Sequence, residues 1–266
     1  MQATQDWVSR YDHLRNDIVR IVKANKVPGK GRGVLRRVWA LTPKRLTAIQ
    51  NRTYLEHTLE RTIVWLLKDQ KIGGEWYNQF NPASGTGGSG RENVDLLKWK
   101  QVEGRAVAHF LELKEWCARD TICHMVEELT RYAMLTKILH DLRVAPYDQW
   151  PSVLEVHLWC MAPHQFFAEQ GGIDAVNKEL SRLRDQWDSV RAQRPVLGRV
   201  ALEARVISLS QDISRESFCE CFDPVTLDNA IQNSRRVASP QCLLNEGDTA
   251  ALRNWITGAM QEGGLL

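Results

Sequence analysis

The sequence predicts an α/β fold in which a mixed β-sheet is flanked by helices. Hydrophobic residues recur at helical spacing in several long segments, and short apolar runs of strand length lie between them. The 266 residues are 43% hydrophobic and 25% charged, which is the balance of a folded globular chain rather than of a disordered one. We therefore expect one large domain or two small ones, with enough apolar side chains for a core.

The N-terminal region is predicted to be an amphipathic helix followed by a basic arm. From Trp7 onward, hydrophobic residues recur every three or four positions, which predicts a helix over residues 5–25. The glycine-rich segment 27–33 ends this helix. Between Ile18 and Leu55 the chain carries ten basic residues and no acidic one, although its net charge is only +3.

Such a basic segment attracts a polyphosphate backbone, so nucleic acid is the leading expected partner. The alternative is a solvated basic face that offsets the acidic remainder of the chain. The residues that we expect to contact phosphates are Lys30, Arg32, Arg36, Arg37, Lys44 and Arg45.

The next part of the chain predicts, in order, a helix, three strands, a helix and a strand. These elements are a helix at about 51–71, strands at 75–80, 93–100 and 105–116, a helix at 121–142 and a strand at 153–160. A short turn containing Glu103 and Gly104 joins the second and third strands, which predicts a β-hairpin. The helix-length interval before residue 153 predicts a crossover to a parallel neighbouring strand.

The remaining segments add to this core. The glycine-rich segment 84–90 is expected to be a flexible loop. A helix at about 173–192, a strand at about 199–209 and helical material up to the C-terminus follow the last core strand.

Three charged residues lie at strand positions where apolar side chains are expected. Side chains alternate across a strand, so Glu112 and Lys114 are expected on one face, together with Phe110 and Trp116. Asp95 lies within the preceding strand. Ionised groups at semi-buried sheet positions are costly unless a partner ion or a bound metal compensates them. A functional site is the economical explanation.

An acid on one strand, followed by acid-x-Lys on the next strand, resembles the pattern of the PD-(D/E)XK phosphodiesterase superfamily, which includes restriction endonucleases and many repair nucleases. Asp95, Glu112, Leu113 and Lys114 carry the resemblance, and the predicted order of elements from about residue 51 to 160 is similar to the core of that family. Val94 stands in place of the proline in the family's name. The resemblance implies a restriction-endonuclease-like core with extra N- and C-terminal helices.

The resemblance also implies an activity, the Mg²⁺-dependent hydrolysis of phosphodiester bonds in DNA. Asp95 and Glu112 would bind Mg²⁺, or Mn²⁺ in its place, together with the backbone carbonyl of Leu113. Lys114 would stabilise the phosphate or orient the attacking water. RNA stays open as a substrate. The alternative is a catalytically inactive member of the fold that binds nucleic acid or a protein partner.

Two helices are expected to contribute further side chains to the site. The helix before the sheet offers Glu56 or Glu60, and a helical wheel slightly favours Glu56, which lies within the apolar arc. Glu128 and Tyr132 lie four residues apart on the helix after the hairpin. They resemble the Gln-x-x-x-Tyr signature of one branch of the superfamily, with glutamate in place of glutamine. Their alternative roles are a salt bridge and a packed tyrosine.

We expect a soluble, cytoplasmic protein with reduced thiols and no membrane partner. No apolar stretch approaches the roughly 18 residues that a membrane span needs, and the first residues have no features of a signal peptide. The six cysteines form no Cys-x-x-Cys pair. A homodimer remains possible. The expected divisions are an N-terminal helix and basic arm at 1–50, a nuclease-like core at 51–211 and a C-terminal helical extension at 212–266.

Overall fold

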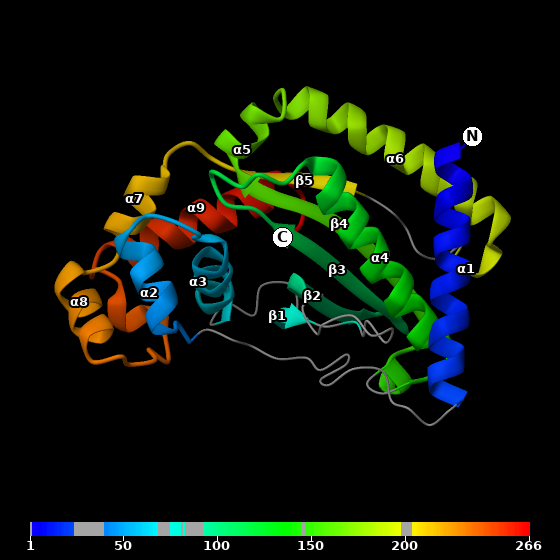
Figure 1. Cartoon of the computed structure of the whole chain (residues 1–266), viewed down its shortest axis with the longest axis horizontal. Coiled ribbons are helices and arrows are strands. Elements are labelled where there is room, and N and C mark those ends of the chain that lie inside the picture. The colour runs from blue at the N-terminus through cyan, green and yellow to red at the C-terminus, as the bar shows by residue number, and fades with distance from the viewer. Residues whose placement is uncertain are drawn as a thin grey trace.

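A computed structural model of the protein describes residues 2–23, 40–68, 75–80, 82, 93–144, 147–197 and 204–266. Within these residues, five strands form one mixed sheet, ordered in space as they are in sequence (Figure 1). They are β1 (Glu75–Phe80), β2 (Val94–Val102), β3 (Arg105–Leu113), β4 (Val153–Pro163) and β5 (Ala204–Leu209). Strands β1 to β3 pair antiparallel, whereas β3, β4 and β5 pair parallel. The α/β class with a mixed sheet flanked by helices is therefore confirmed.

The helices lie before, between and after the strands in much the order that the sequence predicts. They are α1 (Gln2–Lys23), α2 (Pro43–Gln50), α3 (Glu56–Lys68), α4 (Ile122–Asp141), α5 (His164–Glu169), α6 (Ile173–Gln193), α7 (Arg215–Glu220), α8 (Pro224–Gln232) and α9 (Asp248–Glu262). Three short 3₁₀ turns also occur, at Tyr147–Gln149, Pro195–Leu197 and Pro240–Leu243. None of the helices in the described residues is long and apolar enough to cross a lipid bilayer.

The predicted hairpin joins β2 and β3 through a two-residue turn. Glu103 and Gly104 have φ angles of 47° and 74°. Positive φ at both central positions is the geometry that matches the right-handed twist of a hairpin. Val102 and Arg105 form the last cross-strand pair before the turn. The register of the hairpin is therefore fixed at its tip.

The connection from β3 to β4 is the predicted parallel crossover through α4. This helix begins after Thr121, whose side chain accepts a hydrogen bond of 3.3 Å from the backbone N–H of His124. Its apolar face packs on the sheet, and β3 and β4 then pair side by side, with Arg105 opposite Val153. The crossover therefore places the start of α4 at the carboxyl end of β3.

Two hydrophobic clusters cover the two faces of the sheet. One contains residues of α1, α4, α5 and α6, and the other contains residues of α2, α3, α7, α8 and α9. Neighbouring residues of β2 divide between them, because Leu97 joins the first cluster and Leu96 the second. Figure 1 shows α2, α3, α7 and α8 gathered at one end of the molecule, with α1 at the other end beside α6. Both terminal regions thus take part in the packing of the central sheet.

Two expectations about the elements were wrong in detail. The predicted helix at 51–71 begins only at Glu56, and the separate helix α2 precedes it. The expectation that Trp116 shares a face with Phe110 fails because β3 ends at Leu113, so that strand alternation no longer applies at residue 116. Trp116 instead lies in the opposite cluster and stacks on Trp255, with ring centroids 6.1 Å apart.

Candidate active site

Charged side chains converge on Lys114, one residue beyond the end of β3. Its Nζ lies 2.9 Å from Glu112 Oε1, 3.3 Å from Asp120 Oδ2 and 3.8 Å from Glu56 Oε2. These carboxylates come from β3, from the segment before α4 and from the first residue of α3. The Lys114 side chain is only 5% exposed. A nearly buried ammonium group is therefore surrounded by carboxylates from three elements.

Asp95 of β2 completes this acidic centre. Leu96 pairs with Leu111 across the hairpin, and this register places Asp95 opposite Glu112. The Asp95 carboxylate is buried, and its Oδ2 accepts a hydrogen bond of 2.9 Å from the backbone N–H of Leu113. The structure thus brings together Asp95, Glu112 and Lys114 at the end of the hairpin that lies away from its turn.

Burial sets the protonation of the two strand carboxylates. Burial raises the pKa of Asp95 well above its usual range, and the charges of Glu112 and Glu56 raise it further. Burial also raises the pKa of Glu112, to about 8, although Lys114 opposes this shift. The centre therefore carries more acidic groups than its single lysine can neutralise.

Lys114 and Glu56 respond to the same environment. Burial lowers the pKa of Lys114, but the carboxylates of Glu112, Glu56 and Asp95 outweigh it and raise the pKa overall. The lysine is therefore held in its charged form. Burial raises the pKa of Glu56, and Lys114 opposes that shift.

Glu60, the second candidate acid of α3, has different partners. It is fully buried, and its two oxygens accept hydrogen bonds from Asn78 Nδ2 at 2.6 Å and Gln79 Nε2 at 2.9 Å. His57 Nδ1 lies 3.2 Å from the same carboxylate. Strand β1 thus holds Glu60, whereas Glu56 faces Lys114. The signal that could have pointed to these contacts is the polar Asn78 at a strand position between Trp76 and Phe80.

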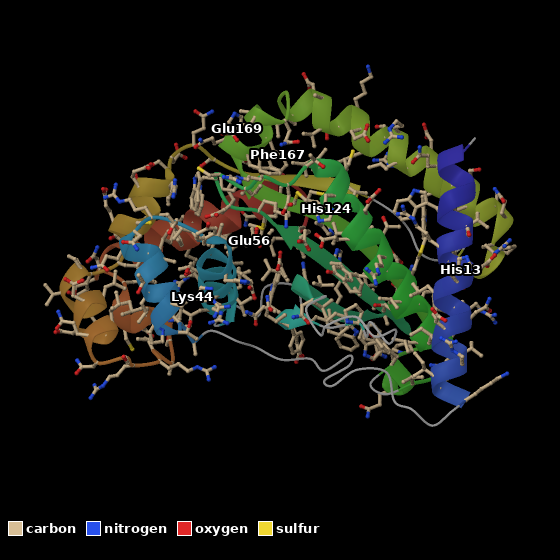
Figure 2. All side chains as sticks on the ribbon, viewed as in Figure 1. His13, Lys44, Glu56, His124, Phe167 and Glu169 are labelled. Carbon is tan, nitrogen blue, oxygen red and sulfur yellow. The ribbon has the colours of Figure 1, made fainter. Side chains whose placement is uncertain are left out.

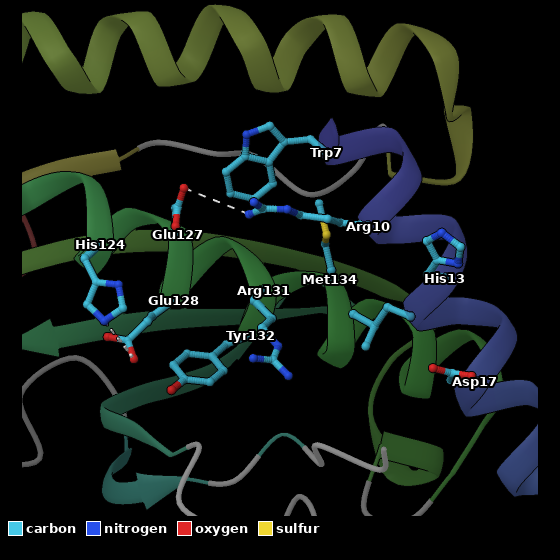
Figure 3. Close-up of a pocket in the computed structure, with 11 residues that line it drawn as sticks. Trp7, Arg10, His13, Asp17, His124, Glu127, Glu128, Arg131, Tyr132 and Met134 are labelled. Atoms are coloured by element: carbon cyan, nitrogen blue, oxygen red, sulfur yellow. Dashed lines mark ion pairs between the residues drawn. The ribbon is translucent and has the colours of Figure 1, made fainter. Parts of the chain in front are cut away.

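Helix α4 continues the site on the side of α1 (Figure 3). Glu128 lies close enough to Glu112 to contribute to the raised pKa of that carboxyl, after burial as the main cause. His124, one turn earlier, places its Nε2 3.7 Å from Glu128 Oε1. Tyr132 is buried one turn further along the helix. Glu128 therefore lies beside the acidic centre, while Tyr132 packs in the cluster formed with α1.

A cavity of about 500 Å³ opens between α1 and α4 next to this helix face (Figure 3). Its lining combines two aromatic rings with basic and acidic groups. The residues are Trp7, Arg10, His13, Leu14, Asp17, His124, Glu127, Glu128, Arg131, Tyr132 and Met134. Glu128 and His124 connect the cavity to the acidic centre.

The acidic centre offers carboxylate oxygens that could be metal ligands, but it does not form a complete metal site. Across the described ranges, no group of three or more His, Cys, Asp or Glu side chains is placed to hold a metal ion. However, Glu112 Oε2 is buried without a hydrogen-bond partner. A buried carboxylate oxygen that lacks a partner, beside a second buried carboxylate, fits a hard divalent cation such as Mg²⁺.

The basic residues expected to bind phosphates fall into two groups. Lys44 and Arg45 lie on α2, where Lys44 is exposed and Arg45 is half-buried; Figure 2 shows Lys44 on this helix and Glu56 at the start of α3. Lys30, Arg32, Arg36 and Arg37 lie outside the described residues, and so does the glycine-rich segment 84–90.

Comparisons of the chain with models of protein families, with curated proteins and with solved structures found no match. The resemblance to the PD-(D/E)XK superfamily is therefore carried by Asp95, Glu112, Leu113 and Lys114 and by the order of the elements. The function has to be inferred from the chemistry of these residues.

Proposed function

We propose that this protein is a Mg²⁺-dependent nuclease with a restriction-endonuclease-like core, which hydrolyses phosphodiester bonds of DNA. The observation that carries the proposal is the position of Lys114, buried among Glu112, Glu56 and Asp120 and next to Asp95. Burying this many ionisable groups is costly, and an interior built for stability alone favours apolar side chains at such positions. Perturbed groups concentrated at the end of a strand are typical of catalytic sites.

Each residue of the centre has a role that its environment supports. Asp95 and Glu112, with the backbone carbonyl of Leu113, would hold Mg²⁺ or Mn²⁺. When bound, the cation would neutralise the phosphate and lower the pKa of a water molecule. Lys114 keeps its proton, so that it can donate to a phosphate oxygen or orient the attacking water. Glu56 contacts the lysine and would fix its position.

The order of the surrounding elements supports the same proposal. Helix α3, strands β1 to β3, helix α4 and strand β4 follow one another in the order that the resemblance implies for the family core. The short segment 114–121 joins the end of β3, where Lys114 lies, to the first turn of α4. Ligand sites in open α/β sheets occur at this carboxyl edge of the strands.

A comparison of two variants tests the proposal. In the presence of Mg²⁺ we expect Lys114→Ala and Asp95→Asn to lower the rate of DNA cleavage by at least about 100-fold, because each removes a group that acts on the reacting phosphate. DNA affinity measured in Ca²⁺ should change little. Lys100→Ala is the matched control, because Lys100 is a half-buried lysine of β2 that lies outside the acidic centre.

Two results would contradict the proposal. If the wild-type protein cleaves neither DNA nor RNA with Mg²⁺ or Mn²⁺ but binds nucleic acid, the fold serves as a catalytically inactive binding module. If Lys114→Ala and Lys100→Ala cleave equally well, the acidic centre is not the catalytic site. Competition between DNA and RNA oligonucleotides identifies the substrate.

A further inference from the structure

Three arginines from distant parts of the chain come together beside α2 and α3. Arg45 belongs to α2, Arg61 to α3, and Arg236 lies in the segment after α8. Leu41 and Val237 exchange two backbone N–H to O hydrogen bonds of 2.9 and 3.0 Å, which hold the Arg236 segment against the residues that lead into α2. Backbone pairing therefore fixes the cluster in place.

The guanidinium groups of this arginine cluster have few partners. Arg61 is only 6% exposed and donates a hydrogen bond to the carbonyl of Ala40. Arg45 is half-buried and donates to Thr42 Oγ1 at 3.4 Å. The Nε atoms of both Arg45 and Arg61 are buried without a hydrogen-bond partner. Arg236 is exposed at the edge of the cluster.

The cluster also lacks a direct ion pair. Within the part of the chain that the structure describes, none of the three arginines forms an ion pair with an aspartate or glutamate. The nearby acid is Glu60, whose oxygens already accept two amide groups of β1. Burial and then the charge of Arg45 lower the pKa of Arg61 to about 10; Glu60 opposes this shift, and Arg236 adds a smaller lowering contribution. Partly desolvated positive charges that outnumber the nearby carboxylate are costly to maintain.

We propose that Arg45, Arg61 and Arg236 bind a phosphate group of the nucleic acid backbone. Guanidinium groups donate paired hydrogen bonds to phosphate oxygens, and a phosphate would supply negative charge that the single carboxylate of Glu60 does not provide for three arginines. The assignment to a backbone phosphate rests on the proposed nuclease function, whereas the affinity for a phosphate group follows from the arginines themselves.

The position of the arginine cluster relates it to the acidic centre. Glu60 acts on the pKa values of Arg45 and Arg61, after burial as the main cause, and it also contributes to the raised pKa of Asp95. The cluster and the centre thus both lie within electrostatic range of the same buried carboxylate. The phosphate that the cluster holds would flank the cleaved bond on the side of α3.

Adjacent residues provide a matched pair of variants. Arg235 and Arg236 are both exposed, but only Arg236 acts on Arg45 and Arg61. In phosphate-free buffer we expect Arg236→Gln to leave Tm unchanged or to raise it by about 2–4 °C, because the substitution removes a repulsive charge. Inorganic phosphate should raise Tm of the wild-type protein and of Arg235→Gln, but much less that of Arg236→Gln.

A second measurement identifies the source of the phosphate. Binding of a single-stranded and of a duplex DNA oligonucleotide is measured in Ca²⁺ over a range of salt concentrations. We expect Arg236→Gln and Arg45→Gln to weaken binding by about fivefold or more, and to lower the slope of log K against log salt by about one. Arg235→Gln should stay within about twofold of the wild-type affinity.

Each result decides between specific interpretations. Equal losses of oligonucleotide affinity in Arg235→Gln and Arg236→Gln would overturn the site, because the loss of one positive charge, wherever it lies, would then explain both results. Phosphate stabilisation without any effect on oligonucleotide affinity would assign the cluster to a free phosphate and overturn the backbone assignment. If oligonucleotide binding depends on Arg236 while the wild-type protein cleaves no substrate, the cluster stands and the nuclease function falls.

Discussion

The Glu112 carboxylate has one oxygen bonded to Lys114 and one buried oxygen with no partner. Its neighbour across the hairpin is Asp95, a second buried acid. Because both groups cannot be ionised at low cost in this environment, the folded protein retains a proton there that an unfolded chain would release at neutral pH. The stability of the metal-free protein therefore depends on pH through this site.

We expect Glu112→Gln to flatten this pH dependence. The pKa of Glu112 in the folded state is about 8, raised above the unfolded value of about 4.3. Its stabilisation is complete below the unfolded pKa and is lost as pH rises through about 8. The variant should gain about 1–3 kcal/mol in free energy of unfolding relative to the wild-type protein between pH 5 and pH 8.

Urea denaturation in metal-free buffer at several pH values measures this difference. The exposed Glu246 provides the control, and Glu246→Gln should follow the wild-type curve. A wild-type protein whose stability rises steadily from pH 5 to pH 8, to the same extent as in Glu112→Gln, would show that Glu112 is ionised in the folded state.

Individual site residues were predictable where strand alternation applies. The charges of Asp95 and Glu112 stand out in apolar strands, Lys114 follows directly after β3, and the structure places the three together. Asp120 was missed as a partner of Lys114 because it lies in an irregular segment with no periodicity. The arginine cluster was not predicted as a unit, although Arg45 was expected to contact phosphates, because Arg61 and Arg236 lie far apart in the sequence and approach each other through tertiary contacts such as the pairing of Leu41 with Val237.

The hairpin of β2 and β3 depends on the backbone conformation of its turn. We expect Gly104→Ala to lower the free energy of unfolding by about 1 kcal/mol, because Gly104 has a φ of +74° and an alanine there is strained. No atom lies within 4 Å of the added Cβ, so that a steric clash is not the cause. Urea denaturation measures the change.

The matched control is Gly258→Ala in α9, where an added Cβ also meets nothing within 4 Å. Gly258 lies in the interior of a helix, so alanine should stabilise the protein by about 0.5–1 kcal/mol. Opposite signs for the two substitutions are the expected outcome. Equal effects would mean that the turn conformation contributes nothing.

At the scale of elements, the sequence predicted some helices and strands with their bounds and missed others. The bounds of β1 coincide with the prediction, because polar and glycine-rich segments delimit Glu75–Phe80 on both sides. Helix α2 was missed because it has only eight residues, too few for a hydrophobic period to show. The signal that could have found it is Thr42 followed by Pro43 at the first helical position.

On the scale of the whole molecule, α1 contributes side chains to the hydrophobic cluster on one side of the sheet. Tyr11 is 2% exposed and lies in the cluster that α4 and α6 form on the sheet. We expect Tyr11→Ala to lower the free energy of unfolding by about 3 kcal/mol or more, because it leaves a large cavity in this cluster. A single unfolding transition at lower Tm, measured by calorimetry, would accompany the loss.

Asn16→Ala on the same helix is the control, since Asn16 is exposed and its loss should change stability by less than about 0.5 kcal/mol. If Tyr11→Ala left Tm unchanged, α1 would not contribute to the stability of the sheet. Sequence periodicity was sufficient to identify this helix, but it could not specify that the helix packs on α4 and α6.

The short turn between β2 and β3 has a consequence for the order in which the molecule assembles. Hairpins close within about 1–10 μs, whereas the alignment of β3 with β4 must wait for the whole of α4 to be accommodated. Asp95 and Glu112 therefore meet in a nascent chain that is still largely open to water. Mild acid, which removes their repulsion, should therefore speed this early step.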